Sequence, residues 1–243
     1  MVVILRKSNI LLLLLVFLLS IAIYSINFGA QDQATVVNDQ GSQKIVILDP
    51  GHGGEDPGAV SDYSGIKEST INLYIAKKAK ELLEKENFKV LMTREEDKLE
   101  YLPETKSVTE KRRQDLTRRK QMMDESGADI VVSIHLNRFP ETKYFGAQTF
   151  FPRDSMESQK LAVSIQDSLR ETVDPNNKRV AMVKGKPGDL PIIILRDLKT
   201  TTAVVECGFL TNPDEEKLLG TTEYQDKLAN AISNGIKKYF EKK

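Results

Sequence analysis

Apolar and polar positions alternate in blocks along the chain from residue 44 onward. Short apolar runs bounded by turn-forming residues predict buried strands at 44–49, 88–93, 129–136, 146–151, 191–196 and 202–206. Segments with apolar residues at helical spacing predict helices at 68–86, 112–125, 155–171, 213–219 and 222–240. The charged stretch 94–111 shows little periodicity and predicts a long exposed loop. Strand runs that alternate with amphipathic helices predict an α/β domain with a largely parallel sheet.

The N-terminal segment follows a different pattern. Arg6 and Lys7 precede an uncharged apolar run from Ile10 to Phe28, which is long enough to cross a hydrocarbon core. Basic residues before the run predict that the rest of the chain lies outside the membrane. A cleaved signal peptide is the alternative, but cleavage after Ala30 would put Phe28 where a small residue is needed. We therefore predict a cytoplasmic stub and transmembrane helix at 1–29, a polar linker at 30–43 and a single globular domain at 44–243.

Charge and cysteine content narrow the classes of function. The chain carries 35 basic and 35 acidic side chains, and this zero formal net charge argues against nucleic-acid binding. Cys207 is the one cysteine, so no internal disulfide can define the fold. Because no cysteine lies near the apolar N-terminal run, a lipoprotein anchor is excluded there.

Two histidines and two glutamates stand where predicted strands end or helices begin. His52 and His135, the only histidines of the chain, lie just beyond or at the end of predicted strands. Glu68 begins the helix that leaves the His52 loop, and Glu206 ends the strand at 202–206. Ligands bind at the carboxyl ends of strands in open α/β sheets. The four side chains can therefore meet in one crevice.

This set of residues fits zinc-dependent hydrolysis. Catalytic zinc often takes two histidines and one glutamate and keeps one position for water. His52, Glu68 and His135 are the candidate ligands, and Glu206 is the candidate base and acid. Explanations without a metal stay open. Either histidine can be a polar residue whose hydrogen bonds are made within the protein, and Glu68 can be an acidic residue that the helix dipole stabilises. Glu206 is harder to explain in that way, because a carboxylate after an apolar run is costly to bury without a partner.

Four motifs resemble, in order, the signatures of one family, the zinc-dependent N-acetylmuramoyl-L-alanine amidases of type 3. The first is DPGHGGEDPGAV at 49–60, and the second is IKESTINL at 66–73, with Glu68 at the ligand position. The third is SIHLN at 133–137, with His135 as a ligand. The fourth is VVECGFLTNPDEEKLL at 204–219, with Glu206 at the catalytic position. The resemblance covers the whole predicted globular domain.

The resemblance implies a twisted, mostly parallel six-stranded sheet flanked by helices, and one zinc ion per chain. It implies hydrolysis of the amide bond between the lactyl group of N-acetylmuramic acid and L-alanine of the stem peptide in peptidoglycan. It also makes Arg119 and Asn137 candidates for substrate binding. Cys207 departs from the family, which usually has an aliphatic residue there, but this does not disturb the chemistry.

Three further features are similar to the membrane-anchored spore-cortex branch of that family. They are TKSVTEKRRQDLTRR at 105–119, GAQTFF at 146–151 and EYQDKLANAI at 223–232. This branch implies a role in cortex maturation through muramic-δ-lactam formation, and hence in germination. The expected location is the cell membrane, with the catalytic domain in the intermembrane space around the forespore. If the signal is cleaved, the expected product is a secreted enzyme.

Two other classes of function are alternatives. A catalytically silent wall-binding or regulatory module could have the same fold, although all four chemical positions are present. A zinc exopeptidase could have a similar sheet, although the four motifs favour the amidase. The expected partners are peptidoglycan glycan strands and stem peptides, and the membrane through the N-terminal helix. Whether an accessory protein licenses the activity does not follow from the sequence.

Overall fold

The computed structural model describes residues 16–19, 43–185, 193–196 and 199–242. The chain divides into two compact units, 1–42 and 43–243. In the first unit, residues 16–19 are helical and exposed. The remainder of the predicted transmembrane segment, and the predicted linker up to residue 42, lie outside the described residues. Within the part of the chain that the structure describes, no helix is long and apolar enough to cross a membrane.

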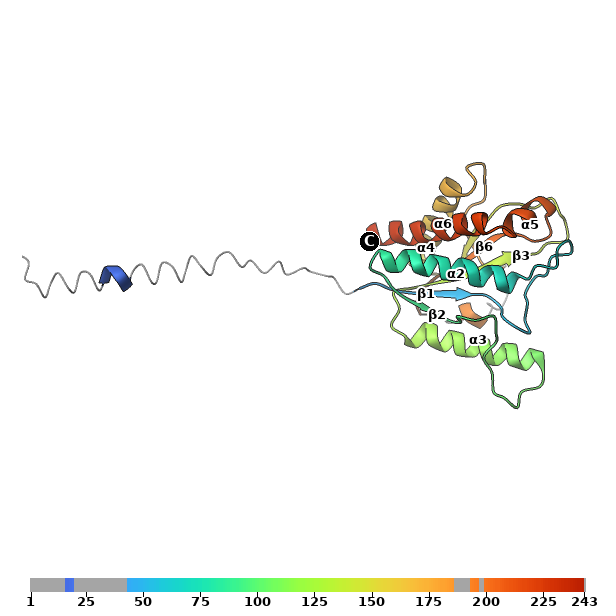
Figure 1. Ribbon diagram of the computed structural model, residues 1–243, viewed down its shortest axis with the longest axis horizontal. Coiled ribbons are helices and arrows are strands. Elements are labelled where there is room, and N and C mark those ends of the chain that lie inside the picture. Colours follow the sequence, from blue (N-terminus) through green and yellow to red (C-terminus); the bar gives the residue numbers. More distant parts are fainter. Residues whose placement is uncertain (1–15, 20–42, 186–192, 197–198, 243) are drawn as a thin grey trace, which may run out of the picture. The chain divides into compact units, whose positions relative to one another are not determined.

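A six-stranded sheet forms the centre of the second unit (Figure 1). In chain order its strands are β1 (Ile45–Pro50), β2 (Lys89–Met92), β3 (Ile130–Asn137), β4 (Gln148–Phe151), β5 (Met182–Val183) and β6 (Thr201–Phe209). Their order in space is β2-β1-β3-β6-β4-β5. Neighbouring strands are parallel except β4 and β6, which are antiparallel. The predicted α/β domain with a mostly parallel six-stranded sheet is therefore confirmed.

The central strands β1, β3 and β6 are apolar on both faces, as parallel strands require. Every residue of β6 after Thr201 is buried, and β1 is buried from Val46 onward. Crossover helices cover both faces of a parallel sheet, so its strands need no outward polar positions. This explains why these strands appear in the sequence as continuous apolar runs.

Helices pack on both faces of the sheet (Figure 1). They are α2 (Glu68–Lys85), α3 (Val108–Glu125), α4 (Met156–Thr172), α5 (Pro213–Leu219) and α6 (Thr222–Glu241), with one 3-10 turn, η1 (Ile193–Leu195). A large apolar cluster lies between the sheet and helices α2, α4 and α6. A smaller cluster lies between the opposite face, α3 and η1. Successive residues of β1 alternate between them, since Val46 and Leu48 join the large cluster and Ile47 joins the small one.

The predicted strand at 191–196 is wrong over its described part. Residues 193–195 form the 3-10 turn η1, and residues 191–192 lie outside the described residues. Ile194 and Leu195 are buried against the sheet face that α3 covers. The run is therefore apolar because it closes the smaller core, and not because it pairs as a strand.

One helix boundary and one short strand also differ from the prediction. Helix α3 begins at Val108, directly after its N-cap residue Ser107, so the predicted helix start at 112 is four residues late. The predicted loop at 94–111 is confirmed as irregular structure over 94–107 and is wrong over 108–111. Strand β5 was not predicted, because two residues cannot show an alternating pattern. Both errors lie outside the strands that end at the candidate ligands.

Candidate active site

The carboxyl edge of the sheet brings His52, Glu68 and His135 together. β1 leads into the loop that carries His52, His135 lies near the end of β3, and Glu68 is the first residue of α2. One ligand atom from each residue lies within 4.8 Å of the other two. This spacing allows a single metal ion to contact all three side chains.

Glu68 is at the centre of the cluster. Its Oε1 lies 3.0 Å from His135 Nδ1 and 3.3 Å from His52 Nε2. The backbone N–H of Ala59 donates to Oε2 at 2.7 Å, and that of Leu136 donates to Oε1 at 3.0 Å. Burial raises the pKa of this carboxyl group, but the two imidazoles reverse the effect and hold it well below its usual range. Glu68 is therefore ionised and suited to bind a cation.

Asp56 fixes His52 from the side opposite Glu68. Its Oδ2 lies 2.9 Å from His52 Nδ1, so that Nε2 faces Glu68. Burial lowers the pKa of His52, but the hydrogen bonds to Asp56 and Glu68 outweigh burial and raise the pKa to about 9. A carboxylate on the outer nitrogen of a metal-binding histidine fixes the orientation and the tautomer of the ring. Asp56 is in the position for that role.

Two glycines allow the ligand side chains to lie against the backbone. A Cβ at Gly51 would lie 2.1 Å from His135 Cε1. A Cβ at Gly58 would lie 2.5 Å from Glu68 Oε2, and Gly58 has a φ of +68°. His52 itself has a φ of 63°, which is uncommon for a residue other than glycine. The glycine-rich motif thus serves close packing around the cluster.

Two buried arginines hold the His52 loop in place. Arg94, at the start of the predicted exposed loop, is only 2% exposed and donates to the carbonyls of Pro50 and Gly51 at 2.9 and 3.0 Å. Arg119 donates to the carbonyls of Pro50 and His52, both at 2.8 Å. Burial and the neighbouring Arg119 lower the pKa of Arg94 to about 10. Both guanidinium groups thus donate hydrogen bonds to backbone carbonyls that the turn leaves inside the protein.

Arg119 is itself paired with two buried carboxylates. Its Nη1 lies 3.1 Å from Asp49 Oδ1, and its Nε lies 2.7 Å from Asp115 Oδ2. Asp49 also accepts hydrogen bonds from the hydroxyls of Ser133 and Thr93, both at 2.6 Å. Arg119 therefore connects α3 to the His52 loop. Its predicted role in substrate binding stays a prediction.

Glu206 lies beside the cluster. In the sheet it is the register partner of His135 in β3 and of Gln148 in β4. It is 8% exposed, and its Oε1 lies 2.6 Å from Lys184 Nζ. The cluster of possible metal ligands found among the described residues does not include Glu206. This position fits a carboxylate that acts next to a metal rather than as a ligand.

Asn137 ends β3, two residues after His135. It is partly buried, and its backbone carbonyl accepts a hydrogen bond from the Leu210 N–H at 3.1 Å. Asn137 is therefore at the same edge of the sheet as the cluster. Contact with a substrate stays a prediction.

Sequence reasoning did not single out Asp56 or Lys184. Asp56 follows His52 by four residues within the first motif, and this short spacing is a signal that a carboxylate could reach the ring. Lys184 lies 22 residues before Glu206, and no sequence pattern joins the two. Only the three-dimensional structure brings the ammonium group to that carboxylate.

A cavity of about 170 Å³ opens next to the cluster. Polar and apolar side chains line it, among them His52, Asp56, His135, Leu99, Leu116 and Ile194. A substrate group in this cavity would contact both histidines and an apolar wall. The cavity is thus a place where a mixed polar and apolar substrate can approach the candidate ligands.

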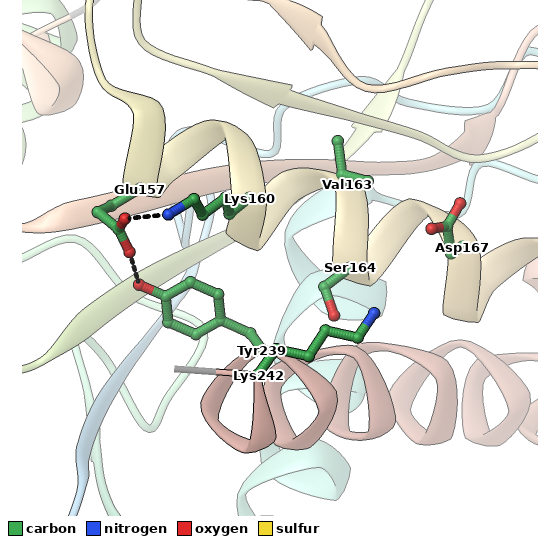
Figure 2. A pocket seen from close by; sticks show the side chains of 7 residues that line it. All are labelled: Glu157, Lys160, Val163, Ser164, Asp167, Tyr239 and Lys242. Atoms are coloured by element: carbon green, nitrogen blue, oxygen red, sulfur yellow. Dashed lines mark hydrogen bonds and ion pairs between the residues drawn. The ribbon is translucent and has the colours of Figure 1, made fainter.

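A larger cavity of about 340 Å³ lies between α4 and α6 (Figure 2). The Tyr239 hydroxyl points to the Glu157 carboxylate at 3.0 Å, and Lys160 lies 2.7 Å from the same carboxylate. None of the predicted site residues lines this cavity. The three polar groups Glu157, Lys160 and Tyr239 contact one another, and we assign no chemistry to this cavity.

Comparison with known proteins gives consistent matches to one family. A family model described as N-acetylmuramoyl-L-alanine amidase matches residues 46–238. The germination-specific N-acetylmuramoyl-L-alanine amidase of Bacillus subtilis is 35% identical over 239 residues, covering 98% of this chain and 97% of that protein. The CwlD amidase of Clostridioides difficile, solved in complex with the GerS lipoprotein, is 41% identical with a TM-score of 0.79, covering 83% of this chain and 100% of that one. An N-acetylmuramoyl-L-alanine amidase from Clostridium difficile 630 is 31% identical with a TM-score of 0.70, covering 83% of this chain and 98% of that one.

Proposed function

The chain belongs to the N-acetylmuramoyl-L-alanine amidase family, and on this premise we propose that it is a zinc enzyme of spore-cortex peptidoglycan. As a member of the family, it hydrolyses the amide bond between N-acetylmuramic acid and L-alanine in peptidoglycan. The proposal adds the identity of the metal, the roles of individual residues, and the cortex as the place of action.

His52, Glu68 and His135 would hold one zinc ion. Two imidazoles and one carboxylate form a donor set that zinc takes in hydrolytic enzymes, and the short distances among their ligand atoms support this assignment. A bound zinc ion polarises the scissile carbonyl and lowers the pKa of water. Asp56 would keep His52 in the orientation and tautomer that a metal needs.

Glu206 would move the proton. Its carboxylate would accept a proton from the attacking water, whose oxygen forms a bond to the lactyl carbonyl carbon. It would then donate that proton to the nitrogen of L-alanine as the C–N bond breaks. The products are a free lactyl carboxylate on muramic acid and a stem peptide with a free amino terminus. The position of Glu206 across from His135, outside the ligand cluster, supports this role.

A single observation carries the proposal. Three side chains from separate elements converge on one point at the carboxyl edge of the sheet, next to a fourth carboxylate. A silent binding module would not need two imidazoles arranged around an ionised Glu68. We therefore favour the active zinc enzyme over a silent module.

The cortex is the proposed substrate because of the relatives' names. The Bacillus subtilis relative is called germination-specific, and the CwlD amidase was solved with a lipoprotein. The first name supports a role in germination, in which loss of stem peptides would prepare muramic acid for δ-lactam formation. By the same comparison, we propose that a lipoprotein partner binds this chain.

The proposed location is the outer face of a membrane. Arg6 and Lys7 before the apolar run Ile10–Phe28 support an anchor with the catalytic domain outside. In a sporulating cell, this side is the space between the two membranes around the forespore. That space contains the cortex peptidoglycan on which the enzyme would act.

Mass spectrometry of digested peptidoglycan tests the proposal. Zinc-loaded protein should release stem peptides that begin with L-alanine and leave muramic acid with a free carboxylate. Protein treated with a chelator should release none, and added zinc should restore the release. Cleavage between amino acids would indicate a peptidase instead, and an unchanged substrate would indicate a silent module.

A further inference from the structure

Lys184 is the ion-pair partner of the proposed proton carrier. Its Nζ lies 2.6 Å from Glu206 Oε1, and the Glu206 side chain is only 10% exposed. A buried carboxylate is costly unless a charged or hydrogen-bonding group compensates it. Among the described residues, Lys184 is the one whose side chain bonds to that of Glu206. The ammonium group thus donates a hydrogen bond to one of the two carboxylate oxygens, Oε1, of Glu206.

The position of Lys184 is itself fixed by the sheet. Its backbone N–H donates to the Phe151 carbonyl at 2.9 Å, which continues the pairing of β4 with β5. Its Nζ also lies 4.5 Å from the centroid of the Phe150 ring, a distance typical of a cation–π contact. Phe150 is the register partner of Val204, two residues before Glu206 on β6. The ammonium group is therefore held on the sheet face that carries Glu206.

We propose that Lys184 is a positioning residue for the reaction, which holds Glu206 by Oε1 and leaves Oε2 to exchange the proton. This inference rests on the proposed role of Glu206. A glutamate side chain has several rotatable bonds, so an unheld carboxylate samples several rotamers. A misplacement of about 1 Å can cost about a hundredfold in rate. Lys184 removes that freedom through one charge-assisted hydrogen bond.

Two substitutions separate positioning from fold stability. Lys184→Met keeps much of the apolar stem and removes the charge. We expect kcat to fall by about tenfold to a hundredfold, with KM within about twofold of the unchanged protein, because the carboxylate is misplaced and substrate contacts are not. Zinc content should not change. The melting temperature should fall, because the Glu206 carboxylate loses the group that compensates its burial, but the variant should stay folded at the assay temperature. Lys184→Arg should restore most of kcat, because a guanidinium group can donate to the same oxygen.

Lys237→Met is the matched control. Lys237 also forms a 2.6 Å ion pair, with Glu86, and its side chain is 29% exposed against 28% for Lys184. Its partner is not part of the site, so kcat should not change. An unchanged kcat in Lys184→Met would overturn the inference. A loss of kcat that disappears when the assay is run well below the melting temperature of the variant would also overturn it, since the loss would then come from unfolding.

A double substitution tests whether Lys184 acts through Glu206. In a Glu206→Gln background, Lys184→Met should change kcat by less than about twofold, because the group that it positions is already lost. A further tenfold loss would mean that Lys184 acts on the substrate directly, contrary to the inference. If Glu206→Gln alone keeps full activity, the proposed role of Glu206 fails and this inference fails with it. If Glu206→Gln is inactive and Lys184→Met is normal, only the inference fails.

A crystal structure gives a readout that does not depend on activity. In zinc-loaded Lys184→Met, the Glu206 carboxylate should occupy more than one rotamer, whereas it should occupy one in the unchanged protein. A single unchanged rotamer in the variant would contradict positioning by Lys184.

Discussion

At the scale of single residues, two of the three candidate ligands are held by a further group that fixes their direction. Glu68 accepts backbone hydrogen bonds from Ala59 and Leu136, and His52 is bonded to Asp56. Such outer contacts set the orientation of ligands and thereby the affinity for a metal. The candidate metal centre therefore extends beyond its three ligands.

Replacing Asp56 tests that extension. We expect Asp56→Ala to weaken zinc binding by about tenfold to a hundredfold, because His52 loses the group that orients its ring. Competition with a chromophoric chelator measures the affinity. Glu55→Ala is a neighbouring control, since Glu55 pairs with Lys111 of α3 but does not contact the cluster. Equal zinc affinity in Asp56→Ala and in Glu55→Ala would contradict the role of Asp56.

Glu215 gives the protein a pH dependence that does not involve the ligands. It is fully buried at 0% exposure, and it accepts the N–H groups of Phe209 and Gly146 at 2.8 and 2.9 Å. Burial outweighs these hydrogen bonds and raises the pKa of Glu215 from 4.5 to about 7. Below pH 4.5 the carboxyl is neutral in both states, so it costs no stability there. Between pH 4.5 and 7 only the unfolded state ionises readily, so stability falls as pH rises across this window.

Thermal unfolding of Glu215→Gln measures this contribution. The free energy of unfolding of the unchanged protein, minus that of the variant, should decrease from pH 4.5 to pH 7. Above pH 7 this difference should stay constant. The difference between the two proteins removes the effect of other titrating groups. A difference that is constant across the window would show that the pKa of Glu215 is not raised.

At the scale of elements, α3 supports the loop that carries His52. Arg119 of this helix bonds to the carbonyls of Pro50 and His52 and pairs with Asp49. Arg112 of the same helix lies 3.0 Å from Asp56 Oδ2. The position of α3 thus affects both the backbone and the hydrogen bond of a candidate ligand.

Replacing Arg119 tests this coupling. Arg119→Met should lower the free energy of unfolding by about 3–5 kcal/mol, because it leaves buried carboxylates without their partner. Zinc affinity should fall as well. Urea unfolding measures the stability, and metal competition measures the zinc affinity. Arg113→Met is the control, because it removes an exposed ion pair with Glu110 on the same helix. This control should change neither the stability nor the zinc affinity. Unchanged stability with a raised KM would instead favour the predicted role of Arg119 in substrate binding.

The elements also show how far the sequence predicts the structure. The long apolar runs at β1, β3 and β6 are recognisable because parallel strands are buried on both faces. The run at 193–195 misleads because an apolar 3-10 turn that fills a core has the same composition as a buried strand. Strand β5 is too short to have a pattern.

The same limit applies to the site. His52, Glu68 and His135 could be predicted because each stands at the end of a strand or the start of a helix. The buried role of Arg94 could not be predicted, because a charged residue after a strand is typical of an exposed loop. Only the fold shows the backbone carbonyls to which Arg94 donates hydrogen bonds. Lys184 could not, because its contact with Glu206 depends on the pairing of β5 beside β4.

At the scale of the whole molecule, the predicted N-terminal anchor would determine which substrate the catalytic domain can reach. Arg6 and Lys7 before the apolar run predict an outward domain. Protease added to intact protoplasts that produce the protein should therefore degrade the domain, as detected with an antibody against it. A domain protected until the membrane is permeabilised would contradict this orientation.

The central claim is that Glu206 moves the proton beside a zinc ion held by His52, Glu68 and His135. The most direct measurement is the rate of stem-peptide release by Glu206→Gln, with zinc content and melting temperature determined on the same sample. We expect one zinc ion per chain, an unchanged melting temperature, and a rate about two to four orders of magnitude lower, as general acid–base catalysis supplies about that factor. Lost zinc would make Glu206 a ligand, and a lower melting temperature would make it a structural partner of Lys184. Near-normal release with full zinc would contradict the account.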